Sequence, residues 1–298
     1  MKHTIRAFAT AFAFVIASHT RNRLAVVLAV FFLPTWIWLV REVTYVGTLH
    51  FHLPALARDL SINSNHMNQT ANALNAATLI LGFMMFMATH KSGDLDRRLV
   101  LAGFPRGPLL CAKAAGMVLV SAAVGLYGAT ILMLLCPVRQ PVALAMAATV
   151  ACLVYGAIGI MLGMLLRGEL EGMFLIIMTS LVDVSMQNPS VNASLDQPGL
   201  ELLPLYAPQQ LATAAVFTGT APWSYALLGL CWFIVTCTAA WALFHVRTRS
   251  HSRRAEPAMP SPRTNLPAAV GGPAGAEEDR EAGQEAASGA AVHDRGPD

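Results

Sequence analysis

The chain has 298 residues, of which 55% are hydrophobic and only 12% are charged, and its formal net charge is +3. Soluble domains carry about 25% charged residues, so this composition indicates an integral membrane protein. A net charge this small does not favour a nucleic-acid-binding protein, because such proteins use many cations to neutralise phosphates.

The N-terminal stretch RAFATAFAFVIASHTRNR (6–23) has basic ends and a short apolar middle. About a dozen apolar residues are too few to cross a bilayer. We therefore expect an interfacial helix along the inner membrane face, with Arg21 and Arg23 leading into the first span. A signal peptide is the alternative interpretation, because small residues near Ala17 follow the apolar run.

Six further apolar runs approach the roughly 20 residues that a helix needs to cross a bilayer. We predict an all-α polytopic membrane protein with one transmembrane domain over 1–250. The composition after Arg254 lacks apolar periodicity, so we expect a disordered cytoplasmic tail over 251–298. The predicted spans are 24–40, 72–88, 108–136, 142–166, 172–187 and 223–246.

Two features of the spans predict how they pack. Pro34 should kink the first span, because proline interrupts helical hydrogen bonding. Gly125 and Ala129 in the third span, and Gly159 and Gly163 in the fourth, recur every four residues. Such faces of small residues allow helices to approach closely.

Lysine and arginine gather on one side of the predicted spans. Because cytoplasmic loops are enriched in these residues, that side is predicted to be inside, with both termini cytoplasmic. The Ala-, Arg- and Gly-rich tail hints at a bacterium, so the plasma membrane of a bacterium is the expected location. The outer side carries only Arg41, Arg58 and Arg139. The inner residues are Lys2, Arg6, Arg21, Arg23, Lys91, Arg97, Arg98, Arg106, Lys113, Arg167, Arg247, Arg249, Arg253 and Arg254.

The stretch HKSGDLDRRLVLAGFPRGPLL (90–110) places many charges between the second and third spans. Residues 94–102 fit a short amphipathic helix, because Leu95, Leu99 and Ala102 recur on one face. This segment either only fixes the topology by its charge or receives force from a cytoplasmic partner.

The ends of this helix are predicted from its capping residues. Ser92 or Asp94 would cap its start by accepting a backbone N–H. Gly103 and Pro105 would end it, because these residues do not continue a helix.

The pattern Lys91-Ser-Gly-Asp-Leu-Asp-Arg97-Arg98-Leu, followed by Gly103-Phe-Pro105-Arg106 and Leu109-Leu-Cys-Ala-Lys113, resembles the signature of type-2 ABC exporter permeases. The drug-resistance (daunorubicin-resistance-like) branch is the most similar. In that family this element docks onto the ATPase subunit. The interfacial helix, the six spans and the segment LLPLYAPQQLATAAVF (202–217) at the outer face before the last span are also similar to the family.

The resemblance implies the transmembrane subunit of an ATP-driven exporter of drug-like, lipid or other amphiphilic substrates. Coupling to a separate ATPase subunit would use the 92–106 segment, and the permease would act as a homodimer or a heterodimer. The chain has no G-x-x-x-x-G-K-[ST] motif, so we expect no enzyme activity and no cofactor in it, with ATP and Mg²⁺ in the partner. The implied coupling residues are Asp94, Leu95, Arg97, Arg98, Leu99, Pro105 and Arg106.

Four amides, Asn65, Asn68, Asn72 and Asn75, are spaced by three or four residues at the outer end of the second span. This spacing puts them on one stripe of a helix. Unsatisfied amides are costly in lipid, so the stripe should face protein or water. It is either an interhelical hydrogen-bond seam or a wall of the export path or of a dimer contact.

Asp183 is the only carboxylate well inside an apolar span, and Thr179, Asp183 and Gln187 share one helix face. A buried acid usually faces a partner or a cavity. Asp183 is therefore predicted either to line the exit of a transport pathway or to hydrogen-bond to the asparagine stripe.

Other functional classes have weaker signals. His50, His52 and His66 lack the further ligands of a zinc site, so we predict loop histidines and no metal. An ATP-independent secondary transporter would need buried ionisable groups in several spans or internal repeats. A non-transporting membrane anchor is a further alternative, whereas an embedded enzyme would need a clustered catalytic set.

Overall fold

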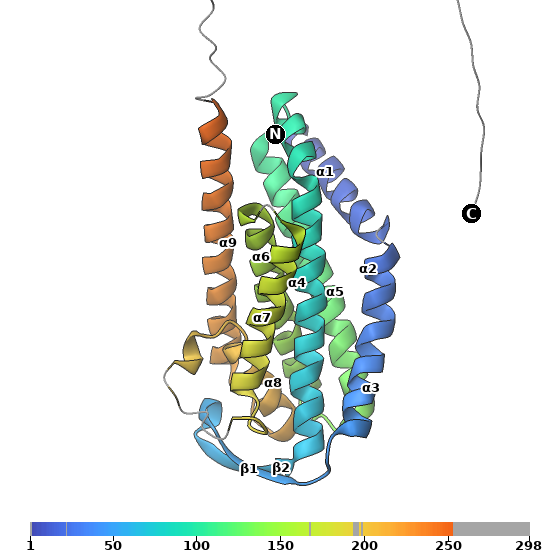
Figure 1. Cartoon of the computed structure of the whole chain (residues 1–298), viewed down its shortest axis with the longest axis vertical. Helices are drawn as coiled ribbons and strands as arrows, with labels where there is room; N and C mark the ends of the chain where they lie inside the picture. Colours follow the sequence, from blue (N-terminus) through green and yellow to red (C-terminus); the bar gives the residue numbers. More distant parts are fainter. Residues whose placement is uncertain (1, 22, 167, 193–196, 198, 253–298) are drawn as a thin grey trace, which may run out of the picture. The chain divides into compact units, whose positions relative to one another are not determined.

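The computed structural model describes residues 2–21, 23–166, 168–192, 197 and 199–252. From residue 253 onward, the predicted tail lies outside the described residues. Long helices run side by side through the described part, and a two-stranded hairpin lies at one end of them (Figure 1). We call this the hairpin end. The opposite end, where α4 (Ser64–Leu101) turns into α5 (Arg106–Leu135), is the α4–α5 end.

Helices make up most of the described chain, and one pair of strands interrupts them. In chain order the elements are α1 (Lys2–Arg21), α2 (Arg23–Val27), a π-helical turn (Leu28–Phe32), α3 (Leu33–Val43), β1 (Thr48–Leu53), β2 (Arg58–Asn63), α4, α5, α6 (Pro141–Leu165), α7 (Glu169–Gln187), α8 (Tyr206–Phe217) and α9 (Trp223–Ser252). Short 3₁₀ turns lie at Pro54–Leu56 and Leu200–Leu202.

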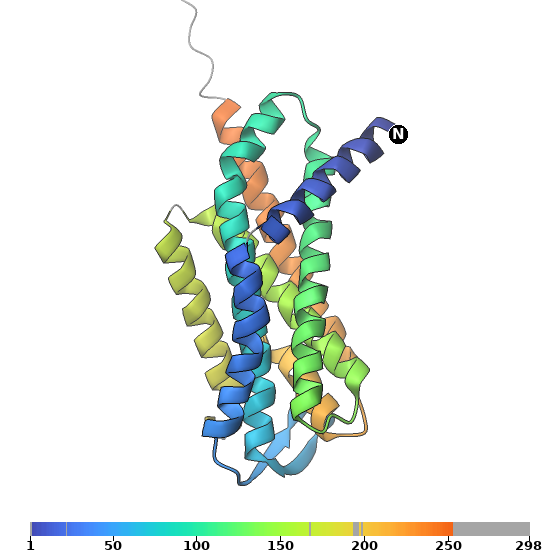
Figure 2. The ribbon, with the colours of Figure 1, turned by 90° about the vertical axis from the view of Figure 1, so that its right-hand side faces the viewer.

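Among the described residues, four helices are long and apolar enough to cross a membrane, and they lie in α4, α5, α6 and α9. They correspond to the second, third, fourth and sixth predicted spans, and they indicate a membrane-embedded helical protein. The first predicted span is present as α2, the π turn and α3, and the fifth as α7. Neither belongs to the four, so the count of six spans stays a prediction. So does the interfacial position of α1, which crosses α5 obliquely (Figure 2).

Pro34 lies in the first turn of α3, directly after the π turn. A proline has no N–H, and its ring collides with the carbonyl four residues earlier, which in this helix belongs to Val30. The π turn relieves this collision because it widens the helix at that carbonyl. The Tyr127 hydroxyl of α5 donates a hydrogen bond to the Val30 oxygen at 2.8 Å. A π turn therefore precedes the proline at the place where a kink was predicted, and α5 satisfies the Val30 carbonyl.

Helix α6 lies at the centre, and between Ala147 and Ala157 only Thr149 is not buried. Glycines allow the neighbouring helices to approach it. A Cβ atom on Gly159 would lie 2.3 Å from the carbonyl oxygen of Gly82 in α4, and one on Gly125 of α5 would lie 2.8 Å from the Thr149 nitrogen. The prediction that these glycines form close packing faces is confirmed.

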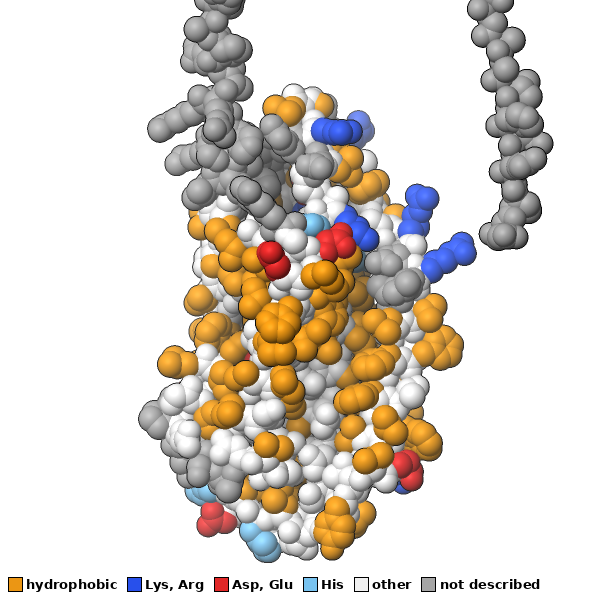
Figure 3. Space-filling model, viewed as in Figure 1, with side chains coloured by type: hydrophobic (Ala, Val, Ile, Leu, Met, Phe, Trp, Pro, Cys, Tyr) orange, Lys and Arg blue, Asp and Glu red, His pale blue; other side chains and the backbone are white. Residues whose placement is uncertain are grey.

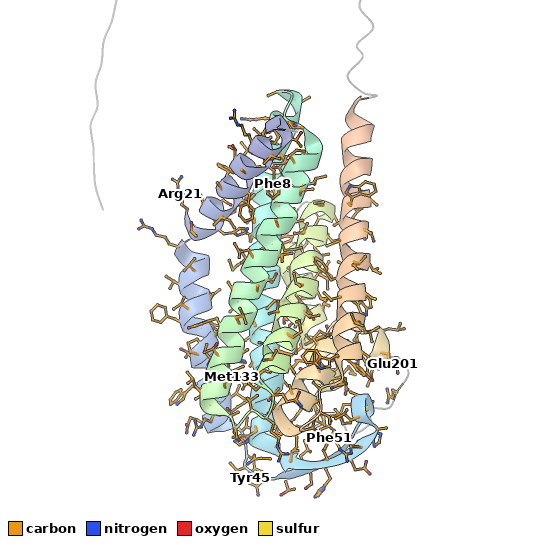
Figure 4. All side chains as sticks on the ribbon, turned by 180° about the vertical axis from the view of Figure 1, so that it is seen from behind. Phe8, Arg21, Tyr45, Phe51, Met133 and Glu201 are labelled. Atoms are coloured by element: carbon orange, nitrogen blue, oxygen red, sulfur yellow. The ribbon has the colours of Figure 1, made fainter. Side chains whose placement is uncertain are left out.

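The prediction of an all-α protein missed a β-hairpin in the 41–71 loop. Strands β1 and β2 pair antiparallel, with Phe51 opposite Leu60. Phe51 points toward the helices (Figure 4), and with Leu53 it packs against Tyr206 and Ala214 of α8. Helix α8 is the segment predicted before the last span. All its residues up to Val216 are buried, because the hairpin covers one side of it and α6 and α9 cover another.

Candidate functional site

The charged segment between the second and third predicted spans belongs to α4. This helix continues without a break to Leu101 (Figure 1), so the prediction of a separate short helix over 94–102 is wrong. Ser92 does not cap a helix start, because its hydroxyl lies inside the helix, 3.4 Å from the Thr89 carbonyl oxygen. A serine that bonds back to its own helix needs no break in the backbone.

The turn after α4 agrees with its predicted end. Gly103 has φ +89°, which glycine adopts without a steric cost. The N–H of Phe104 donates to the Leu99 carbonyl at 3.0 Å, which is the closing bond of a Schellman motif. Pro105 is extended, and α5 begins at the next residue. Helices α4 and α5 thus form a helical hairpin whose turn extends past the ends of α6 and α7 (Figures 1 and 2).

The predicted coupling residues lie in the last turns of α4, in the turn after it and at the first residue of α5. Arg98 and Pro105 are exposed, Leu95 is 43% exposed and Leu99 is half-buried. On the face shown in Figure 3, lysine and arginine side chains gather toward this end, and hydrophobic side chains cover the middle. The last turns of α4 therefore present an apolar side chain and a cation together on the surface. The side chains of the other three predicted residues, Asp94, Arg97 and Arg106, lie outside the described part of the structure.

An ion pair that the sequence reasoning missed connects the two arms of the α4–α5 hairpin. The Lys113 ammonium of α5 donates to the Asp96 carboxylate of α4, and it donates to the Ser92 hydroxyl at 2.9 Å. The Ser92 hydroxyl also lies 3.3 Å from Asp96 Oδ2. The side chains of Lys113 and Asp96 are 26% and 14% exposed. The sequence did contain a signal for this ion pair, because Asp96 and Lys113 lie at similar distances before and after the predicted turn.

Helix α1 packs against the α5 arm of this hairpin. Ala11 is buried with Leu109 and Ala112 of α5, and Phe8 and Phe12 pack against this cluster. Phe8 points from α1 toward the neighbouring helices (Figure 4). The α4–α5 turn is therefore attached to a third helix through apolar contacts.

The first member of the asparagine stripe, Asn65, connects α4 to α3. Its Nδ2 donates to the carbonyl oxygens of Arg41 and Thr44 at the end of α3, both at 2.8 Å. Its Oδ1 accepts a hydrogen bond from Gln69, whose Oε1 in turn accepts one from the Cys136 thiol at 3.1 Å. Asn65 therefore caps one helix and connects it, through Gln69, to the end of α5.

Two other members of the stripe connect α4 to α7. Asn68 accepts a hydrogen bond from the Asn188 amide at 2.8 Å, just after α7, and Asn75 accepts one from the Ser180 hydroxyl of α7. Asn72 donates to the Asn68 carbonyl of its own helix at 3.0 Å. The contacts of Asn68 and Asn75 fit the interpretation of the stripe as an interhelical seam.

Asp183 is fully buried where α6, α7 and α8 meet. Its carboxylate accepts hydrogen bonds from the Tyr155 hydroxyl of α6, from Gln187 Nε2 at 2.9 Å, and from the backbone N–H of Leu205. All three donors are neutral. Tyr155 is also fully buried and gave no signal in the sequence, because one tyrosine in an apolar span is common in helix cores.

Thr179 does not join Asp183 and Gln187, although the three residues share a helix face. It lines an apolar groove of about 310 Å³ between α6, α7 and α9, together with Leu175 and Trp232. The three predicted pathway residues therefore divide between a buried polar cluster and an apolar groove.

Of the three histidines that were predicted to lie in loops, His52 lies on β1, whereas His66 lies in the first turn of α4. His52 Nδ1 of β1 lies 2.8 Å from the Asp59 carboxylate of β2, directly opposite it in the hairpin. Within the residues that the structure describes, no group of three potential metal-binding side chains occurs.

No protein-family model matches this sequence, and a comparison with curated proteins gives no significant match. The likeness to type-2 ABC exporter permeases therefore depends on the motif residues around the α4–α5 turn and on the order of the helices.

Proposed function

We propose that the chain is the transmembrane subunit of a type-2 ABC exporter, which moves a drug-like, lipid or other amphiphilic substrate outward. The observation that supports this most is the shape of the α4–α5 hairpin. Its exposed, charged turn is a rigid continuation of two helices that are long enough to cross a membrane. A force applied to such a turn would displace both helices, whereas a flexible loop would change its own conformation and leave the helices in place.

The driving force would come from a separate ATPase subunit that binds at the turn. ATP binding would close a pair of ATPases and displace the turns of two permease subunits, either two copies of this chain or this chain and a related one. Helix α4 touches α6 through Gly82 and Gly159, so its displacement would be passed to the central helix. The transmembrane helices would thereby alternate between inward-open and outward-open arrangements, in contact with membrane lipids.

We place the α4–α5 end in the cytoplasm of a bacterium, with the permease in the plasma membrane. The first residues of α1, the α4–α5 turn and the end of α9 lie at this end (Figures 1 and 2). The hairpin end carries Arg41, Arg58 and Arg139. The larger number of predicted inner cations favours this orientation.

A secondary transporter is the main alternative, and it would place ionisable groups in several spans. Among the described residues, Asp183 is the only charged side chain that is buried. This single acid, held by neutral donors, supports an ATP-driven mechanism better than a proton-coupled or ion-coupled one.

The test reverses the charge at the end of α4, just before the turn, with Arg97→Glu plus Arg98→Glu. We expect normal membrane insertion, and we expect loss of both ATPase co-purification in mild detergent and substrate-stimulated ATP hydrolysis. The matched control, Arg58→Glu plus Arg139→Glu, reverses two exposed cations at the hairpin end and should retain both properties. Wild-type stimulation in the Arg97 and Arg98 variant, or the absence of any ATPase in the purified complex, would contradict the proposal.

A further inference from the structure

The ion pair between α4 and α5 lies close to the turn without being part of its exposed surface. Asp96 is five residues before Leu101, and Lys113 is seven residues after Arg106. At 1.5 Å per residue, both lie about 8–10 Å along their helices from the turn. The pair therefore crosslinks the two arms at matching heights.

The pair is shielded enough to hold one geometry. With 14% and 26% of their side chains exposed, Asp96 and Lys113 are screened less by water than a surface pair, and the Ser92 hydroxyl accepts a second bond from the ammonium. Removing one partner breaks the ion pair, and water still reaches the charge that remains. The two arms would then move independently near the turn.

The ion pair is next to the site where α1 packs against α5. Its neighbour in sequence, Ala112, is fully buried in the cluster with Ala11. The α5 arm is thus fixed to α1 on one side, while the ion pair fixes the α4 arm to α5. Three helices meet at this height, just below the turn.

We infer that Asp96 and Lys113 are positioning residues, which hold α4 and α5 as one rigid body so that a force at the turn moves both helices together. They act through the turn and need not touch the partner. The expected loss of stimulated ATP hydrolysis rests on the proposed function. The expected change in the distance between α4 and α5 depends on this chain alone.

The experiment measures the two consequences separately. Spin labels at Leu101 of α4 and Leu119 of α5, both exposed, report the position of the turn relative to α5 in the full-length protein. The exposed Cys111 and Cys231 are replaced by alanine so that they are not labelled. The rate of ATP hydrolysis by the purified complex is measured without substrate (the basal rate) and with an amphiphilic substrate (the stimulated rate). The variants are Asp96→Asn, Lys113→Gln and the reversed pair Asp96→Lys plus Lys113→Asp.

Each single variant should broaden the distance distribution and reduce stimulated hydrolysis by about fivefold or more, with basal hydrolysis retained. The reversed pair should restore both, because it keeps the attraction. Controls are Glu169→Gln and Arg21→Gln, which change exposed charges elsewhere; Arg21 points away from the helices (Figure 4).

Unchanged distances in both single variants, or no recovery in the reversed pair, would overturn the inference. If stimulation falls only in proportion to the amount of folded complex, the pair has a structural role and not a positioning one. If no ATPase co-purifies, the proposed function fails, while the distance measurement still decides whether the pair positions the turn.

Discussion

Two carboxylates in this molecule connect helices in different ways. Asp96, near the α4–α5 turn, is paired with a cation, and 14% of its side chain is exposed. Asp183 is fully buried and is held by the neutral groups of Tyr155, Gln187 and the Leu205 backbone.

The difference follows from the environment of each carboxylate. A cation buried beside Asp183 would itself lose its hydration, and the attraction between the two charges often fails to compensate for that loss. Neutral donors satisfy the carboxylate oxygens without burying a second charge. Near the turn, water still reaches the pair and lowers the cost of a lysine. The buried cluster should therefore stabilise the fold, whereas the ion pair should mainly fix a geometry.

Substitution of Tyr155 should have the largest effect on stability. Replacing it with alanine should lower the free energy of unfolding by about 3–5 kcal/mol, because a fully buried aromatic side chain leaves a cavity. Tyr155→Phe removes only the donor to Asp183 and should cost about 1–3 kcal/mol. Unfolding in mixed micelles by SDS titration, followed by circular dichroism, measures both. Equal losses in the two variants would show that the hydrogen bond, and not the packing, dominates.

The same substitution at the two carboxylates tests the comparison directly. Asp183→Asn places an amide N–H against the Gln187 donor and should cost about 1–3 kcal/mol of unfolding free energy. Asp96→Asn leaves Lys113 close to water and should cost no more than about 1 kcal/mol. The two variants are compared in the same SDS titration. A larger loss at Asp96 would refute the proposed difference between a stabilising cluster and a positioning pair.

The sequence predicts the helices better than it predicts their connections. Apolar runs located α4, α5, α6 and α9, because burial in lipid or protein needs long apolar segments. The break expected near residue 94 was wrong, since Ser92, one of the two predicted caps, bonds within its own helix and to Lys113 of the neighbouring one. A local change in the helix near Pro34 was predictable, because proline has no N–H, but the π turn that precedes it was not.

The contacts of the site were harder to predict than its residues. Asp183 and Asn75 stood out as polar groups in apolar runs, but their partners Tyr155 and Ser180 are separated from them by 28 and 105 residues. Such pairing depends on how the helices pack, which no local pattern encodes. The β-hairpin was missed in the same way, because β1 and β2 are short and are held by their contact with α8.

The seam between α4 and α7 should give a smaller effect than the Asp183 cluster. Ser180→Ala removes the donor to Asn75 and should cost about 0.6–1.7 kcal/mol, as for other hydrogen bonds between membrane helices. The matched control is Thr179→Val, one residue earlier in the apolar groove, which should change the stability by less than about 0.5 kcal/mol. The same unfolding titration separates them, and a larger loss in the control would assign the effect to α7 packing instead.

The smallest expected effect is the dependence of stability on salt, which should differ between the two carboxylates. Raising the ionic strength from about 0.01 M to 1 M shortens the Debye length from about 30 Å to 3 Å. The stability difference between the wild-type protein and Lys113→Gln should then shrink by a few tenths of a kcal/mol, to below about 0.5 kcal/mol, because water partly reaches this pair. The difference for Tyr155→Phe should not change, since its contact with Asp183 is buried. A salt response at Tyr155 would mean that ions reach the centre of the helices, and the buried cluster would then have to be regarded as part of an aqueous path.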